Sequence, residues 1–439
     1  MSPVSNTHLP SDPPNGVAPI AWPVPLRALF RFTFLYFVVS ATYWVLTFAD
    51  KSAALLTKAY SAVWRPVVHG VASHLFHWPA RIEPNFLHDS QYLYALETSF
   101  LLVALLFAGL WSVLDRKQQR YDRLNHALRV FVRYVLAYLM LHYGMDKVFL
   151  LQFPAPSPAR LVERFGDYSP NSLMWAFIGS STVYTIFGGL AEITGALLLL
   201  FRKTTTLGAL ITFAVMFNVT VMNFSYDVTV KLLCLNILLM AIYLVLPDAG
   251  RLLNFFFLNR ATQPALLAPP LVNQRMAGLA PWIKTALVLY IALAPTLRDW
   301  RMYRTQGAGA PLPPLYGLYE ARDFAIGETI HPPMLSDPVR WRYVIFDAPN
   351  KITLQRMDES RKTYFMVYDS ARHEITIDAQ DDPLDKSVFS VNQPAPDQMT
   401  LQGKVAGAVV VAHLQKIDPR SFTLTSRGFH WISESSFVR

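Results

Sequence analysis

The stretch LGALITFAVMFNVTVMNFSYDVTVKLLCLNILLMAIYLVL, which runs from Leu207 to Leu246, decides the fold class. A helix needs about 20 mainly apolar residues to cross a bilayer, because the hydrocarbon layer is about 30 Å thick and each residue rises about 1.5 Å. The stretch contains two such segments, Leu207–Phe224 and Val228–Leu246, joined by the short polar link Ser225-Tyr226-Asp227. The sequence therefore predicts an antiparallel pair of membrane-spanning helices.

Five further apolar segments lie outside this pair and are also long enough to span a bilayer. They are Leu29–Phe48, Tyr94–Leu114, Val130–Leu150, Ser180–Phe201 and Leu279–Leu297. Of the 439 residues, 53% are hydrophobic and only 16% are charged, which is more apolar than an ordinary soluble domain. We therefore expect an α-helical polytopic membrane bundle of about seven spans, with the lipid bilayer as its surroundings.

The charged and metal-binding residue types exclude several classes of function. The formal net charge is +9, but the basic residues flank the apolar segments, so we expect no nucleic-acid partner. The single cysteine, Cys234, excludes an internal disulfide, a CxxC redox pair and a thiolate metal cluster. No carboxylate or cysteine completes a ligand set around His69, His74 and His77, so we predict no metal site.

Two basic loops predict the orientation in the membrane. One loop separates the second and third spans, the other follows the fourth span, and positive charges in short loops stay in the cytoplasm. These residues are Arg116, Lys117, Arg120, Arg123 and Arg129 in the first loop, and Arg202 and Lys203 in the second. Seven spans then place the N-terminus in the cytoplasm and the C-terminal domain in the periplasm, for a protein of the bacterial inner membrane.

Changes of composition along the chain predict its domains. Residues 53–76 are too polar to cross the bilayer, so we expect one or two interfacial helices there, with Trp64 and Trp78 at the headgroups. The predicted parts are a disordered tail (1–25), N-terminal spans with an interfacial loop (26–128), a four-helix core (129–260), a seventh span with its flanks (261–304) and an extra-cytoplasmic β domain (305–439).

The C-terminal part has the period of β-strands. Beyond the Gly/Pro linker Gly307–Pro314, apolar residues alternate with polar ones and turn signals recur about every ten residues. We expect seven or eight antiparallel strands in an all-β barrel or sandwich, and favour the barrel. The last strand is predicted in FTLTSRGFHWI, residues 422–432. The interior of such a barrel can hold an apolar ligand or can be filled by packed side chains, and the sequence leaves both alternatives open.

Ionisable side chains within the predicted spans are the candidate site, because they are expensive to bury in a membrane. In the third span Tyr134, Tyr138, His142 and Asp146 recur every four residues and share one helix face, with Lys147 beside them. Three more ionisable residues lie at a similar predicted depth, so a charge-compensated pocket open to the outside is one hypothesis: Glu97, Asp227 and Lys231.

The fourth span places Glu192 near the middle of the membrane, between glycines that permit close helix approach. A carboxylate without a partner would be protonated there, because desolvation penalises its charged form. Three roles are open: a proton carrier, a hydrogen-bond donor to a quinone carbonyl, or a structural partner of Asn218.

Two short motifs stand within residues 129–260: Gly144-Met145-Asp146-Lys147, a glycine-x-x-lysine, and Glu192–Leu198, an E-x-x-G-x-L-L. With these motifs, residues 129–260 resemble the DoxX-like family of four-helix membrane proteins, which has the first motif in its first helix and the second in its second. Arg202 and Lys203 fit the basic turn into its third helix, and Asn218–Lys231 looks like a feature of the larger members. The resemblance implies a four-helix unit with both ends in the cytoplasm.

Two functions are open. The resemblance implies a subunit or accessory of a membrane redox system, since some DoxX-like proteins serve membrane redox chemistry, including a quinone-reducing thiosulfate oxidoreductase subunit. Such a protein would bind a quinone or other isoprenoid among spans three to six and work with a redox partner protein. The alternative is a non-enzymatic scaffold or lipid-handling protein whose β domain binds a periplasmic partner. No nucleophile–base constellation or phosphate-binding loop decides whether the protein is an enzyme.

Overall fold

The computed structural model describes residues 21–49, 53–79, 82, 88–264, 278–378 and 384–437. It forms two compact units, and several helices contribute to both. Unit 1 comprises residues 1–139, 198–216 and 229–285, and unit 2 comprises residues 140–197, 217–228 and 286–439. Most of the predicted disordered tail, residues 1–20, lies outside the described residues, and the first helix begins at Val24.

Seven helical segments in the described part of the chain are long and apolar enough to cross a membrane, which confirms the predicted class of multi-pass membrane protein. They are α1 (Val24–Phe48), α3 (Gln91–Leu114), α4 (Asp122–Val148), α7 (Thr182–Leu199), η3 with α8 (Arg202–Ser225), α9 to α10 (Lys231–Phe256) and α11 (Ala280–Thr305). The fifth segment consists of η3 (Arg202–Thr204) and α8 (Thr205–Ser225). The sixth consists of α9 (Lys231–Val245), η4 (Leu246–Asp248) and α10 (Ala249–Phe256).

Two of these helices extend well beyond their apolar segments. Helix α4 begins at Asp122 and not at Val130, and α11 ends at Thr305 and not at Leu297. Backbone hydrogen bonding continues into polar sequence as long as no glycine or proline interrupts it, so hydropathy alone underestimates both helices. The extension of α11 proves important, because it carries two charged residues of the candidate site.

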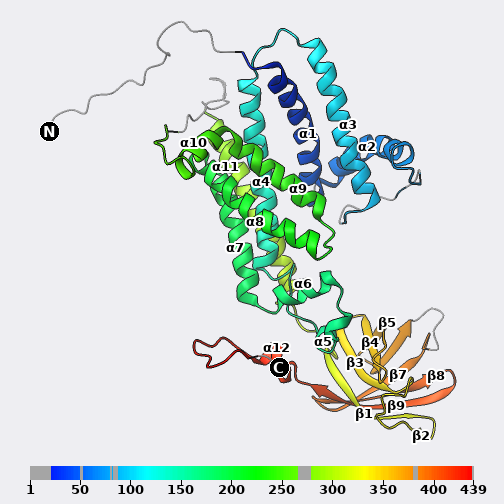
Figure 1. The fold of residues 1–439 in the computed structure, drawn as a ribbon. Helices are drawn as coiled ribbons and strands as arrows, with labels where there is room; N and C mark the ends of the chain where they lie inside the picture. The colour runs from blue at the N-terminus through cyan, green and yellow to red at the C-terminus, as the bar shows by residue number, and fades with distance from the viewer. Residues whose placement is uncertain are drawn as a thin grey trace. The chain divides into compact units, whose positions relative to one another are not determined.

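In unit 1, α1 and α3 pack along each other, as the blue and cyan helices of Figure 1 show. The predicted interfacial segment is one helix, α2 (Ala54–His74), and it packs against α3. The side chain of Trp64, which was expected at the headgroups, is buried in the protein, with its ring 4.6 Å from that of Phe100 on α3. The two rings meet edge to face, an arrangement that adds packing energy to the contact between α2 and α3.

Unit 2 contains the C-terminal part of α4, most of α7 and the β domain. Three short helices connect α4 to α7: α5 (Pro158–Leu161), η2 (Phe165–Asp167) and α6 (Pro170–Gly179). Ser169 caps α6 by accepting a hydrogen bond from the Ser172 amide, and Pro170 occupies its first turn. Both features are typical of a helix start, so this connection has a defined structure of its own.

The β domain is a closed antiparallel barrel of eight strands, which confirms the favoured prediction (Figure 1, yellow to red). The barrel strands follow sequence order, and β9 pairs back with β1 to close the barrel. Its eight strands agree with the predicted seven or eight, and the two-residue strand β2 pairs with the end of β1 as a short addition. The strands are β1 (Gly317–Ile326), β2 (Thr329–Ile330), β3 (Trp341–Ala348), β4 (Lys351–Arg356), β5 (Arg361–Asp369), β6 (Glu374–Asp378), β7 (Val388–Ala395), β8 (Gln398–Val405) and β9 (Ala408–Ile417).

Side chains fill the barrel interior, so packed side chains, and not an apolar ligand, are its content. The predicted alternation holds on β5 and β6, where Tyr364, Met366, Ile375 and Ile377 point inward and are buried. They join one continuous apolar core with large residues from the other strands, among them Phe324, Trp341, Phe346, Phe389, Met399 and Leu414. An eight-stranded barrel has an interior just wide enough to be filled in this way.

The strand predicted in residues 422–432 is wrong. The segment forms a short helix, α12 (Thr423–Ser426), followed by irregular backbone in which Trp431 is 91% exposed. The turn before it, at Pro419–Ser421, is capped by the Asp418 side chain, which accepts from the Arg420 amide. Strand β9 already pairs on both sides, so the closed sheet offers this segment no long free edge.

Within unit 2 the barrel is attached to the α5 segment through Arg361. Its guanidinium donates to the carbonyl oxygens of Ala159, at 3.1 Å, and Val162, and lies 3.9 Å from the Glu163 carboxylate. Ser157 adds a hydrogen bond of 3.0 Å to Asp347 on β3. Burial lowers the pKa of Arg361, while Glu163 acts in the opposite direction. These contacts fix the barrel against the loop that follows α4.

Candidate functional site

Two glycines bring the C-terminal part of α4 against α7 in unit 2. A Cβ atom on Gly144 would lie 2.9 Å from the carbonyl oxygen of Gly189, and one on Gly189 would lie 2.6 Å from that of Gly144. Real Cβ atoms do not approach oxygen so closely, so only glycine permits this contact at both positions. Such a contact between small residues is the usual way for membrane helices to associate tightly.

This close contact lets Lys147 and Glu192 form a buried ion pair. The Lys147 Nζ donates to both carboxylate oxygens of Glu192, at 2.8 and 2.9 Å, and both side chains are almost fully buried. The hypothesis that Glu192 is unpaired, or paired with Asn218, is therefore wrong; Asn218 lies exposed on α8. Lys147 directly follows Asp146 of the predicted stripe, and it reaches Glu192 because the two glycines let the helices approach closely.

A second polar cluster lies beside this pair and centres on Arg298 of α11. The Arg298 guanidinium donates to Asp146 Oδ1 and to Asp299 Oδ1, each at 2.6 Å. Its Nη1 also lies 2.5 Å from His142 Nε2, which in this arrangement accepts the hydrogen bond and carries no proton. We call His142, Asp146, Arg298 and Asp299 the Arg298 cluster.

The Arg298 cluster holds more carboxylates than cations. Arg298 faces both Asp146 and Asp299, while Lys147 is balanced by Glu192. Asp299 is 0% exposed, and its second oxygen, Oδ2, has no hydrogen-bond partner among the described residues. Burial of an uncompensated negative charge is costly, so one added proton or one hydrogen-bond donor from a ligand would stabilise the cluster.

Aromatic rings adjoin the cluster on the same helices. The Trp300 and Tyr303 rings of α11 stack with centroids 6.0 Å apart, and both contact Phe149, which directly follows α4. The Trp300 side chain is about half exposed. Hydrogen-bonding groups and aromatic side chains thus lie close together in the sequence of α11 and at the end of α4.

The remaining predicted site residues have other surroundings. In unit 1, Tyr138 donates to the Phe48 carbonyl at 2.8 Å, and the Lys231 amide donates to Asp89 at 2.8 Å. In unit 2, Asp227 has a positive φ of 52° at the end of α8, where it turns the chain toward α9. Only His142, Asp146, Lys147 and Glu192 of the predicted set thus lie together in the polar region of unit 2.

Glu97 has its own buried hydrogen-bond network in unit 1. It accepts from Asn236 Nδ2 at 3.1 Å and from the Tyr36 hydroxyl at 3.3 Å, and Tyr36 and Ser40 also bond to the Asn236 oxygen. These partners are neutral, and they join α1, α3 and α9 through one asparagine. Glu97 thus has a structural role in this network, because its hydrogen bonds hold neighbouring helices together.

Comparison with known proteins places the chain in a family. It is 30% identical over 138 residues to the uncharacterized protein YwoB of Bacillus subtilis (strain 168), a match that covers 30% of this chain and 88% of the relative. The chain belongs to the same family as YwoB. No protein-family model and no solved structure matches it.

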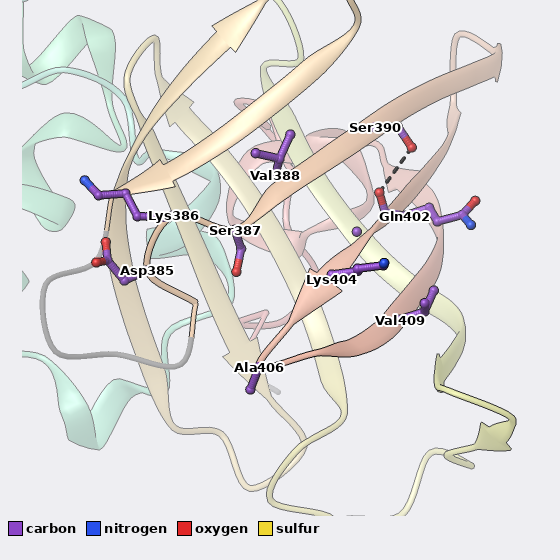
Figure 2. Close-up of a pocket in the computed structure, with 10 residues that line it drawn as sticks. Asp385, Lys386, Ser387, Val388, Ser390, Gln402, Lys404, Ala406 and Val409 are labelled. Atoms are coloured by element: carbon purple, nitrogen blue, oxygen red, sulfur yellow. Dashed lines mark hydrogen bonds between the residues drawn. The ribbon is translucent and has the colours of Figure 1, made fainter.

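Two hollows in this YwoB-family protein differ in character. One, of about 790 Å³, lies on the barrel at β7 to β9, and Figure 2 shows its polar lining with the hydrogen bond from Ser390 to the Gln402 carbonyl. The other, of about 730 Å³, lies in unit 1 at the ends of α4 and α8 and is strongly basic. The described part of the chain contains no group of three or more side chains arranged to hold a metal ion.

The sequence did not reveal Arg298 and Asp299 as site residues of this YwoB-family protein. Both follow the last apolar segment, where charges usually mark the end of a span. One sequence signal could have revealed them. A basic residue alone is enough to end a span, so an aspartate directly beside the arginine indicates an additional role for the pair. Their participation depends on α11 continuing past Leu297 as a helix.

Proposed function

We propose that this protein is a membrane subunit or accessory of a redox system that binds a quinone beside the Arg298 cluster and exchanges protons with it. The observation that carries this proposal is the fully buried Asp299, whose Oδ2 lacks a partner within a cluster that has a surplus carboxylate. A protonated Asp299 would donate a hydrogen bond to a carbonyl oxygen of the quinone. The resemblance to the DoxX-like family points in the same direction.

The proposal assigns a distinct task to each part of the site. Reduction of a quinone to the quinol takes up two protons and two electrons, and the electrons come from a redox partner protein. The Arg298 cluster passes on both protons, taking up the second from water after it has given the first, while Phe149, Trp300 and Tyr303 hold the flat ring. The Lys147–Glu192 pair fixes α7 against α4 behind the cluster and does not need to contact the quinone.

Identification of small molecules that copurify with the full-length protein is the direct test. We expect a quinone in the extract, and equilibrium titration with a short-chain quinone should give at least about tenfold weaker binding for Asp299→Asn and His142→Gln. Asp323→Asn, which removes an exposed carboxylate from β1, is the matched control and should bind as the parent protein does. If no quinone binds, or all three variants bind it equally, the assignment of this site is wrong.

We further propose that the N-terminus is cytoplasmic and that the barrel lies in the periplasm of a bacterial inner membrane. The basic residues between α3 and α4 and those of η3 support this orientation, because short positive loops resist translocation. Reporter fusions after Arg120 and after Ile330 should give opposite topological signals. Identical signals would contradict the orientation and leave the quinone test unaffected.

A second candidate function is a non-enzymatic scaffold whose barrel binds another protein. Exposed apolar side chains on β5, Phe365 at 61% and Val367 at 70%, favour it, because they lie two residues apart on one strand face and adjoining exposed apolar residues suit protein contact. Val388 on β7 lies on the same outer surface and is also exposed. Purification under native conditions should then recover a stoichiometric partner that Phe365→Ser loses, while quinone binding is absent.

A further inference from the structure

The basic hollow of unit 1 lies where three candidate spans begin or end. Its walls come from the first turns of α4, from η3 and the start of α8, and from η4 and α10. Five cationic side chains line it against a single carboxylate, Asp248: Arg129, Arg133, Arg202, Lys203 and Arg251. None of these residues belongs to the Arg298 cluster, so the hollow is a separate feature of the molecule.

The carboxylate in the hollow is already engaged. Asp248 accepts hydrogen bonds from Arg251, at 2.5 Å, and from the Thr206 hydroxyl. Arg251 also donates to the Gln263 carbonyl at 2.9 Å. Asp248 is therefore bonded to Arg251 and also attracts Arg129, and among the described residues the lining supplies no second carboxylate for Arg133 or Lys203.

Two of these arginines have buried donors without a partner. The Nε atoms of Arg129 and Arg133 are buried and form no hydrogen bond among the described residues, and Arg133 as a whole is only 6% exposed. The Arg133 Nη1 donates a long hydrogen bond, 3.4 Å, to the Thr205 hydroxyl. A buried guanidinium without an anion is costly, so the arrangement is built for an anion that it can bond.

Helix α8 adds to the positive potential. Thr205 and Thr206, its first two residues, line the hollow, and the first turn of a helix presents amide N–H groups and the positive end of the helix dipole. Arginine forks and helix N-termini together are the arrangement that proteins use to bind phosphate oxygens. The apolar residues Val130, Leu244 and Pro247 in the same wall suit the carbon skeleton attached to a phosphate.

We infer that this hollow binds a phosphate group, carried either by an anionic phospholipid at the membrane surface or by a free phosphate compound. A volume of about 730 Å³ lies in the range of small-molecule sites and holds more than a bare ion. Basic pockets between membrane helices on the cytoplasmic side are typical sites for lipid headgroups. The inference is independent of the proposed quinone site, because it rests on unit 1 alone.

The test compares the two sources of phosphate on the purified full-length protein. The probes are vesicles of phosphatidylcholine alone, vesicles that also contain phosphatidylglycerol, and inorganic phosphate against chloride at equal ionic strength. Binding to the hollow should raise the melting temperature, because a ligand of the native state stabilises it. A rise with phosphatidylglycerol alone identifies a lipid headgroup, and a rise with inorganic phosphate identifies a free phosphate.

Variants distinguish the hollow from general attraction to a negative surface. Lys203→Gln removes an exposed cation of the lining, Arg133→Gln a buried one, and Arg123→Gln an exposed cation of α4 outside it. The first two should weaken the apparent affinity at least about fivefold and Arg123→Gln less than about twofold. Lys203→Gln keeps the test valid if Arg133→Gln does not fold. No stabilisation by either probe, or equal losses for Lys203→Gln and Arg123→Gln, would overturn the inference.

Discussion

Lys147 on α4 bonds both carboxylate oxygens of Glu192 on α7, 45 residues further along the chain. Both side chains are buried and bonded to each other, so removal of either leaves a buried charge without its hydrogen-bonded partner. Lys147→Met should therefore destabilise the protein by about 3–5 kcal/mol. Lys147→Met combined with Glu192→Leu should recover most of this loss, as thermal unfolding of the four proteins of the cycle would measure. A double variant no more stable than Lys147→Met would contradict a pairwise role.

The glycine contact between α4 and α7 gives a prediction with an internal control. Gly189→Ala introduces a Cβ atom 2.6 Å from the Gly144 carbonyl oxygen, whereas at the neighbouring Gly188 the nearest atom lies 3.8 Å away. Gly189→Ala should cost about 1–3 kcal/mol through overpacking. Gly188→Ala should be neutral or stabilise by about 0.5–1 kcal/mol, because alanine favours the helix. Equal melting temperatures for the two variants would show that the helices do not meet here.

The attachment of the barrel to α5 depends on Arg361. Arg361→Met keeps the length of the side chain but removes the donors to the Ala159 and Val162 carbonyls. Hydrogen exchange of residues 157–167 should then become faster, while exchange within the barrel core stays unchanged. Arg372→Met, at an exposed arginine in the turn after β5, is the control and should alter neither region.

Asp337 should make the barrel sensitive to acid. Its burial acts to raise the pKa, but hydrogen bonds from the Arg340 and Val339 amides and from His331 outweigh burial and lower the pKa below the ordinary value. The carboxylate therefore contributes stability at pH values above about 4, the pKa of an unfolded aspartate, and this contribution disappears as the pH falls through the lower folded value.

Hydrogen exchange of peptides from residues 317–346, corrected for the intrinsic rate, would measure this effect between pH 6 and pH 2 in steps of about one unit. The parent protein should lose protection in the acid range. Asp337→Asn should be less protected at neutral pH and should respond less to acid. Parallel pH profiles for the two proteins would assign the acid response to other groups.

The sequence predicted those helices and strands that are determined by the composition or the pattern of their own residues. A segment such as Tyr94–Leu114 must span because of its length and composition, and β5 and β6 alternate because one face is buried. The sequence could not predict the pairing of Lys147 with Glu192, because it depends on how closely two helices approach. Residues 422–432 alternate like a strand, but alternation does not reveal whether a sheet has a free edge. Arg298 remained unrecognised for a similar reason, since only the continuation of α11 brings it to His142.

The pairing of β1 with β9 also determines when the barrel can form. Leu318 pairs with Ile417, so the strands that close the barrel stand at opposite ends of the domain sequence. During synthesis, β1 lacks its partner β9 until all the other strands of the barrel have been made, and such long-range pairing is slow. The nascent domain thus exposes an unpaired strand edge for most of its synthesis, a period in which a chaperone would be the natural protection against aggregation.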